Sequence, residues 1–148
     1  MLHKKTRQQE ATVHSFDRMV SAAGWVDENV LLIASEVNLF LYDLNDRTEK
    51  HLIDLEKDKP KNRSNDGRSD PWGGFWIGTM GKNSETEVGA IYRYFKGKLQ
   101  QIISKVTISN SICFSPDKKF CFFCDTATKN IMRVELDKKN GYPIKNPE

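Results

Sequence analysis

The sequence predicts an all-β protein built as a β-propeller of four-stranded blades, of which the chain holds about three. Two observations carry this prediction. Three short apolar runs of strand composition begin at Val30, Phe75 and Phe120, which are 45 positions apart each time. The turn-forming pairs Asp70-Pro71 and Ser115-Pro116, again 45 apart, precede the second and third runs. A repeat of roughly 40 to 50 residues carrying about four antiparallel strands is typical of a propeller blade.

The remaining strands follow each apolar run in turn. Each run is followed by a second strand candidate, and the first two repeats add a third after the hairpin turns Asn45-Asp46 and Lys96-Gly97. A short helix is expected over residues 10–20. The strands expected are residues 30–34, 39–44 and 48–55, then 64–70, 75–79, 90–94 and 99–106, and finally 120–124 and 131–136.

The repeat divides one domain of residues 1–148 into approximate units 11–55, 62–106 and 108–148. A β-sandwich also has closely spaced strands, but its sequence would not repeat at a fixed interval of 45 residues. Propellers close with about four to eight blades, so three repeats do not close a ring. We therefore expect a fragment of a longer product, a ring completed by several copies, or a different number of blades.

Composition and charge exclude several classes of protein. At 148 residues, with 38% hydrophobic and 29% charged residues, the chain suits one globular domain. Its net charge of +3 is spread along the sequence, so nucleic acid is not an expected partner. No apolar stretch approaches the roughly 20 residues of a membrane span, and the basic N-terminus lacks a following apolar region. We expect a cytoplasmic protein with no membrane partner.

The three cysteines, Cys113, Cys121 and Cys124, are an odd number set among aromatic and aliphatic residues. This pattern favours reduced thiols in the core over a disulfide framework. Cys121 and Cys124 form a CxxC, but residues three apart in an extended strand point to opposite faces. A shared metal or a redox pair is therefore not expected there.

The segment richest in polar groups is residues 62–81, NRSNDGRSDPWGGFWIGTMG, where polar side chains lead into a core strand. A shift by one repeat carries Asn65 onto Asn110, so both are expected to face the central channel. Arg63 lies two residues before Asn65, on the same side of an extended strand. The first repeat has Val20 at this place, which cannot bind a ligand through a polar group.

Each of these residues also has a purely structural interpretation. Asn65-Asp66-Gly67 has the composition of a turn that its own side chains cap. Arg63 could be a surface cation, and Asp66 and Asp125 are expected to tie blades together rather than to bind a ligand. The coincidence of Asn65 with Asn110 is what favours function for that pair.

Two longer motifs resemble a known family. The runs NRSNDGRSDP, from Asn62 to Pro71, and FWIGTM, from Phe75 to Met80, resemble the signature of the senescence marker protein, regucalcin, gluconolactonase and luciferin-regenerating enzyme family. The segments GAIYR at 89–93 and ISN at 108–110 are similar to further parts of it. The resemblance runs from about Ala11 to the C-terminus. It implies a six-bladed propeller, of which this chain would hold about three blades.

The resemblance also implies an activity, the hydrolysis of a sugar lactone such as gluconolactone at a divalent metal on the propeller axis. Ca²⁺ is the ion expected first, with Mg²⁺, Mn²⁺ or Zn²⁺ as further possibilities. Asn110 matches the family's asparagine ligand of the metal. Arg63 and Asn65 match the pair that contacts the substrate, so the implied partner is a small-molecule sugar lactone.

The sequence departs from the family pattern in ways that bear on activity. The family's glutamate and aspartate ligands have no counterpart here, and no catalytic residue is identified. Ser111 follows Asn110 where a glycine is usual, and Glu85 is the nearest acid after the GTM element. The isolated chain is therefore expected to be an inactive fragment that self-associates through unpaired blade edges. The alternative is a non-catalytic propeller that binds a small sugar-like ligand or a protein.

Overall fold

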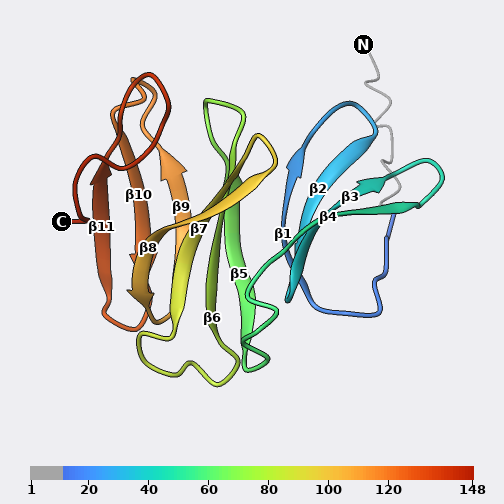
Figure 1. The fold of residues 1–148 in the computed structure, drawn as a ribbon, viewed down its shortest axis with the longest axis horizontal. Coiled ribbons are helices and arrows are strands. Elements are labelled where there is room, and N and C mark those ends of the chain that lie inside the picture. The colour runs from blue at the N-terminus through green and yellow to red at the C-terminus, as the bar shows by residue number, and fades with distance from the viewer. Residues whose placement is uncertain (1–11) are drawn as a thin grey trace, which may run out of the picture.

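The computed structural model describes residues 12–148 and consists of three antiparallel β-sheets (Figure 1). The first and second sheets have four strands each, and the third has three. Residues 12–148 contain no α-helix, which confirms the predicted all-β class. In this part of the chain there is accordingly no helix long and apolar enough to cross a membrane.

Strands that are neighbours in the sequence are neighbours in each sheet, as expected for a chain of hairpins. The strands of the first sheet are β1 (Val20–Trp25), β2 (Val30–Ser35), β3 (Asn38–Asp43) and β4 (Glu49–Asp54). Those of the second sheet are β5 (Asn62–Ser69), β6 (Phe75–Gly81), β7 (Gly89–Phe95) and β8 (Lys98–Val106). Those of the third sheet are β9 (Ser109–Phe114), β10 (Phe120–Asp125) and β11 (Asn130–Glu135).

The first strands of the three sheets, β1, β5 and β9, lie together, with β5 contacting both of the others. The other strands of each sheet follow outward from this inner strand, which is the arrangement of propeller blades (Figure 1). All three inner strands begin at the lower end of the molecule in Figure 1. Side chains near the starts of β5 and β9 therefore share one end of the fold.

Two apolar clusters fill the spaces between the sheets, so each sheet is buried against the next by its alternating side chains. The cluster between the first and second sheets includes Leu32, Ala34, Leu39, Phe75 and Ile77. The cluster between the second and third includes Trp76, Ile91, Ile112, Phe123 and Val134. These clusters make β6 a strand buried on both faces, because Trp76 and Ile77 point to opposite sides.

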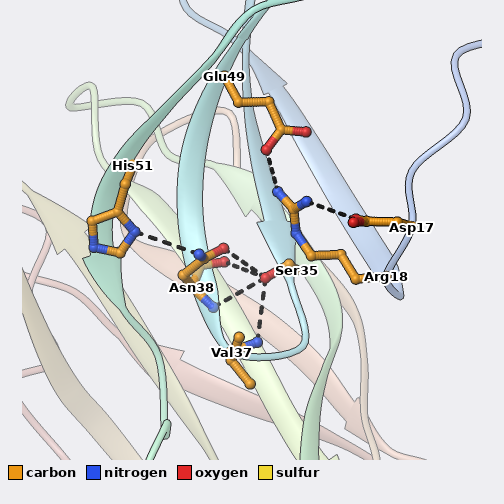
Figure 2. Close-up of polar contacts among 7 residues, drawn as sticks. All are labelled: Asp17, Arg18, Ser35, Val37, Asn38, Glu49 and His51. Atoms are coloured by element: carbon orange, nitrogen blue, oxygen red, sulfur yellow. Dashed lines mark hydrogen bonds and ion pairs between the residues drawn. The ribbon is translucent and has the colours of Figure 1, made fainter.

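The segment before β1 packs on the outer face of the first sheet. Phe16 lies edge-on to Phe40 and Tyr42, with ring centroids 5.8 and 5.0 Å away. Arg18 stacks over Phe40. It also pairs with Glu49, at a distance of 2.5 Å; this ion pair is drawn in Figure 2. The prediction of a short helix over residues 10–20 is wrong for the described residues 12–20. Phe16 and Arg18 pack on the first sheet instead, and the segment that carries them is not helical. Residues 10 and 11 lie outside the described part.

In each sheet, a polar side chain closes the turn between the first two strands. Asp27, Asp70 and Ser115 each accept hydrogen bonds from backbone amides two to five residues further on. The β2–β3 turn is closed by Ser35, whose hydroxyl contacts Val37 and Asn38 (Figure 2). The first repeat lacks the turn-forming pair of the other two in its sequence, but its turn is closed by the same kind of hydrogen bond.

The prediction that all three cysteines are core thiols is wrong for two of them. Cys121 is buried against the second sheet, but Cys113 is exposed and Cys124 is only half-buried. The cause is strand alternation, because Cys121 and Cys124 point to opposite faces and only one of these faces meets another sheet. Burial raises the pKa of the Cys121 thiol, which keeps it protonated and inert.

The outer edge of β11 is occupied by the C-terminal residues. Ile144 donates its amide to the carbonyl of Glu135, and Arg133 and Glu148 exchange two backbone hydrogen bonds of 2.7 and 3.0 Å. This segment takes the place of a fourth strand in the third sheet. The face of that sheet that points away from the second sheet is uncovered in the described structure, and Ile131 there is 73% exposed.

Candidate functional site

Arg63 and Asn65 lie at the start of β5, and the structure brings their side chains together. One terminal nitrogen of Arg63 donates to the Asn65 side-chain oxygen and to the carbonyl of Ser64, both at 2.9 Å. This contact requires the two side chains to lie on one side of the strand, as the sequence spacing predicts. The Nε and Nη2 atoms of Arg63 bond to no other described residue, so this half-buried guanidinium keeps donors for a ligand.

Asn65 connects the second sheet to the third. Its side-chain nitrogen donates to the carbonyl oxygen of Ser109 at 2.8 Å, directly before Asn110. Asn65 does not close a local turn, because its partners are Arg63 on its own strand and Ser109 on the next inner strand. The amide thus has one donor and one acceptor engaged inside the protein and retains one further N–H and one lone pair.

Asn110 is half-buried on β9, and its side-chain nitrogen donates to the hydroxyl of Thr126 at 3.2 Å. The next residue, Ser111, has a φ of +58°, which lies in the left-handed region that glycine adopts most easily. The serine therefore keeps the backbone that a glycine would adopt. Both β5 and β9 have a bulge beside their asparagine, where the regular pairing with the next strand of the sheet is interrupted.

Ser109 explains the glycine of the GTM element. A Cβ on Gly78 would lie 2.2 Å from the Ser109 hydroxyl oxygen, so only glycine lets β9 approach β6 this closely. Ser109 is completely buried, and its hydroxyl has no hydrogen-bond partner among the described residues. No sequence pattern assigns a role to Ser109, because its importance arises from packing between sheets.

The predicted structural roles of Asp66 and Asp125 agree with their contacts. Asp66 accepts a hydrogen bond of 2.7 Å from the amide of Ile112 on the third sheet. Asp125 accepts the amides of Thr107 and Ile108, at 2.9 and 3.0 Å, in the link that leads into β9. Arg68, for which the sequence predicted no role of its own, donates to the carbonyl of Ile112 at 2.8 Å.

Acidic and basic side chains gather in the loops at the same end of the second sheet. Glu85 folds over Gly81 and accepts the backbone amide of Asn83. Backbone hydrogen bonds and the nearby charge of Lys61 lower the pKa of Glu85, so it is a carboxylate at neutral pH. Lys82 pairs with Glu36, in the turn between β2 and β3, at 2.7 Å.

The described residues alone do not fit a divalent cation. They contain no group of three or more histidine, cysteine, aspartate or glutamate side chains able to hold a metal. Asn110 offers one neutral oxygen, whereas Ca²⁺ takes about six to eight oxygen ligands and Mg²⁺ about six. Asn110 can therefore be at most one ligand of a site whose other ligands are not among these residues.

Comparison with known proteins gives the same family as the motifs. The family model described as the SMP-30/Gluconolactonase/LRE-like region matches residues 2–147. A protein of Rhizobium meliloti (strain 1021), provisionally named a sugar lactone lactonase, is 40% identical over 135 residues, 91% of this chain and 46% of its own length. An L-arabinolactonase of Azospirillum brasilense is 32% identical over 119 residues, 78% of this chain and 39% of its own length.

A crystal structure of a calcium-binding protein, regucalcin, from Agrobacterium tumefaciens str. C58 superimposes with a TM-score of 0.89 at 44% sequence identity. The match covers 93% of this chain and 46% of that protein. The chain thus spans about half the length of the relatives that it matches. With a family model over nearly its full length, the chain belongs to the SMP-30/gluconolactonase/LRE-like family.

Proposed function

We propose that this chain forms three blades of a six-bladed propeller and contributes one side of a site for metal-dependent hydrolysis of a sugar lactone. The observation that carries the proposal is the hydrogen-bonded chain from Arg63 through Asn65 to Ser109, directly beside Asn110. It joins the polar residues of two successive inner strands at one end of the fold. Lactonase names among the relatives support the same substrate class.

In this proposal, Arg63 and Asn65 bind the lactone. The free guanidinium donors of Arg63 suit hydroxyl and carbonyl oxygens, while Asn65 can both donate and accept. Because Asn65 holds Arg63 at 2.9 Å, the guanidinium is oriented before the substrate arrives. Hydrolysis adds water to the lactone carbonyl and breaks the ring C–O bond, which yields the aldonic acid.

Asn110 is proposed to supply one oxygen ligand to a divalent cation, with Ca²⁺ the first candidate because a related structure is described as calcium-binding. Its side-chain nitrogen is held by Thr126, which leaves the oxygen free to face a cation. Since one amide oxygen cannot hold the ion, residues 1–148 alone are expected to show no metal-dependent lactone hydrolysis.

A second candidate is a non-catalytic propeller that binds a small sugar-like ligand or a protein. The observation in its favour is that Asn65 is engaged at both ends of its side chain within the protein. In that case Arg63 would recognise a ligand without any turnover. An assay of turnover separates the two candidates.

The experiment uses a chimera in which this chain replaces the matching region of the Azospirillum brasilense L-arabinolactonase. A chimera that unfolds cooperatively should hydrolyse L-arabinolactone, and Arg63→Ala should reduce kcat/KM by about tenfold or more, the loss of a charge-assisted hydrogen bond. Arg47→Ala, at an exposed turn of the first sheet, is the matched control and should leave kcat/KM unchanged. A folded chimera without turnover would favour the binding candidate.

A further inference from the structure

Three side chains of β5 hold the backbone of β9 around the residue after Asn110. The amide of Asn65 reaches the carbonyl of Ser109, and Asp66 and Arg68 reach the amide and the carbonyl of Ile112. All three distances lie between 2.7 and 2.8 Å. These bonds cross from the second sheet to the third. They fix the residue before Asn110 and the residue after Ser111, namely Ser109 and Ile112.

The backbone within these bonds is the strained part of β9. Ser111 has a φ of +58°, which is unfavourable for any residue with a Cβ and persists only where the surroundings determine it. The bulge of β9 falls here too, because Asn110 pairs with Cys124 while Cys113 already pairs with Phe122. The ladder to β10 therefore does not fix this stretch, and the bonds from β5 can.

Among the three, Asp66 is the residue best placed to set this conformation. Its carboxylate accepts the amide of Ile112, the peptide group that directly follows Ser111, at 2.7 Å. A hydrogen bond to a charged acceptor is stronger than one between neutral groups. Although Asp66 precedes a glycine, its bond spans 46 positions, so it is not a local turn cap.

We propose that Asp66 is a positioning residue, which acts through the backbone of Ser111 and Ile112 to aim the side chain of Asn110 at the propeller axis. This inference rests on the proposed function, in which Asn110 supplies a ligand to the metal. It predicts that Asp66 touches neither substrate nor metal. It also predicts that a glycine at position 111, which adopts a positive φ freely, makes Asp66 less necessary.

The test is a double-mutant cycle of Asp66→Ala and Ser111→Gly in the 148-residue chain, followed by NMR. Asp66→Ala should lower hydrogen-exchange protection of the Ile112 amide by about tenfold, the effect of losing one hydrogen bond. It should also move the side-chain amide signal of Asn110. Ser111→Gly in the Asp66→Ala background should return that signal toward its original position, and Asp66→Asn should have a smaller effect than Asp66→Ala.

The matched control is Asp117→Ala. Asp117 caps a local turn of the same sheet through Ser115 and Lys119, so its loss should leave the Asn110 signal in place. An Asn110 signal that does not move in Asp66→Ala, or a Ser111→Gly change that fails to restore it, would overturn the proposal. If Asp66→Ala does not fold, the same comparison is made with Asp66→Asn. None of these readouts depends on lactone turnover, so the positioning role and the proposed activity can fail separately.

Discussion

The side-chain amide of Asn65 donates a hydrogen bond to the carbonyl oxygen of Ser109 at 2.8 Å, and so joins the second sheet to the residue directly before Asn110. The two asparagines that the 45-residue repeat aligns are thus linked through one backbone carbonyl. Because Ser109 is completely buried, this carbonyl has no access to water if the bond is lost.

Asn65→Ala is therefore expected to reduce the free energy of unfolding. The loss should be about 1–3 kcal/mol, the range for leaving a buried acceptor unpaired. Urea unfolding followed by tryptophan fluorescence measures it, with Asn45→Ala in the exposed β3–β4 turn as the control. Equal midpoints for the two variants would show that the bond contributes nothing to stability.

Gly78→Ala is expected to destabilise the protein by about 1–3 kcal/mol, the range for overpacking a core. The new Cβ would lie 2.2 Å from the Ser109 hydroxyl oxygen and 2.4 Å from its Cβ. Combining it with Ser109→Gly removes both atoms and should recover part of the loss. Thermal unfolding of the single and double variants tests this coupling, and purely additive effects would contradict it.

The buried ion pair of Asp70 and Arg93 is expected to be among the contacts most sensitive to substitution. Both side chains are fully buried, with 2.6 Å between Oδ2 and Nε, and Asp70 also accepts the indole N–H of Trp76. Arg93→Met would leave a buried carboxylate without its cation, at a cost of about 3–5 kcal/mol. The exposed Arg133, paired with Glu148, provides the control, because Arg133→Met should cost about 1 kcal/mol or less. Denaturant unfolding of both variants decides between these values, and a similar loss in each would contradict the prediction.

Glu56 is expected to make the protein sensitive to acid. Burial by itself would raise the pKa of Glu56, but hydrogen bonds from Lys59, Tyr92 and Asn62 outweigh it and lower that pKa. A lowered pKa gives a stabilisation that is present above the carboxyl's ordinary pKa and is lost as the pH falls through the folded value. Glu56→Gln should therefore be less stable than the original chain near neutral pH, and the gap should close in acid.

Measuring the unfolding midpoint against pH for both proteins tests this expectation. Tyr92→Phe removes one donor and brings the folded pKa of Glu56 closer to its ordinary value, so the acid-dependent loss should be smaller and should be complete at a higher pH than in the original chain. Glu28→Gln, an exposed change in the β1–β2 turn, is the control and should follow the original curve. A gap between Glu56→Gln and the original chain that is independent of pH would rule out the carboxylate as its cause.

Much of the fold could be predicted because the repeat is visible in local sequence. The apolar runs at Val30, Phe75 and Phe120 begin β2, β6 and β10 at those same residues. The helix predicted over residues 10–20 is wrong for residues 12–20, because Phe16 packs on the first sheet instead. β1 was not predicted because it lacks an apolar run of strand composition. Residues such as Ala22 and Gly24 are small, because the first and second sheets approach each other closely there.

The sequence was enough to predict which residues form the candidate site, but not which hydrogen bonds they make between the sheets. The spacing of Arg63 and Asn65 was enough to place them on one side of β5. The bonds from Asp66 and Arg68 to Ile112 span more than 40 positions and depend on how two sheets meet, which no local pattern encodes. The positive φ of Ser111 could have been suspected only from the family's glycine at that place.

The measurement that tests the central claim most directly is the Ca²⁺ affinity of a chimera in which this chain replaces the matching half of the Agrobacterium tumefaciens regucalcin. Calorimetric titration should show that the chimera binds Ca²⁺ and that Asn110→Ala weakens binding by about tenfold or more, as expected for a lost oxygen ligand. Asn45→Ala in the same chimera should bind like the unsubstituted form. Unchanged Ca²⁺ affinity in an Asn110→Ala chimera that unfolds cooperatively would contradict the claim that this chain contributes a metal ligand.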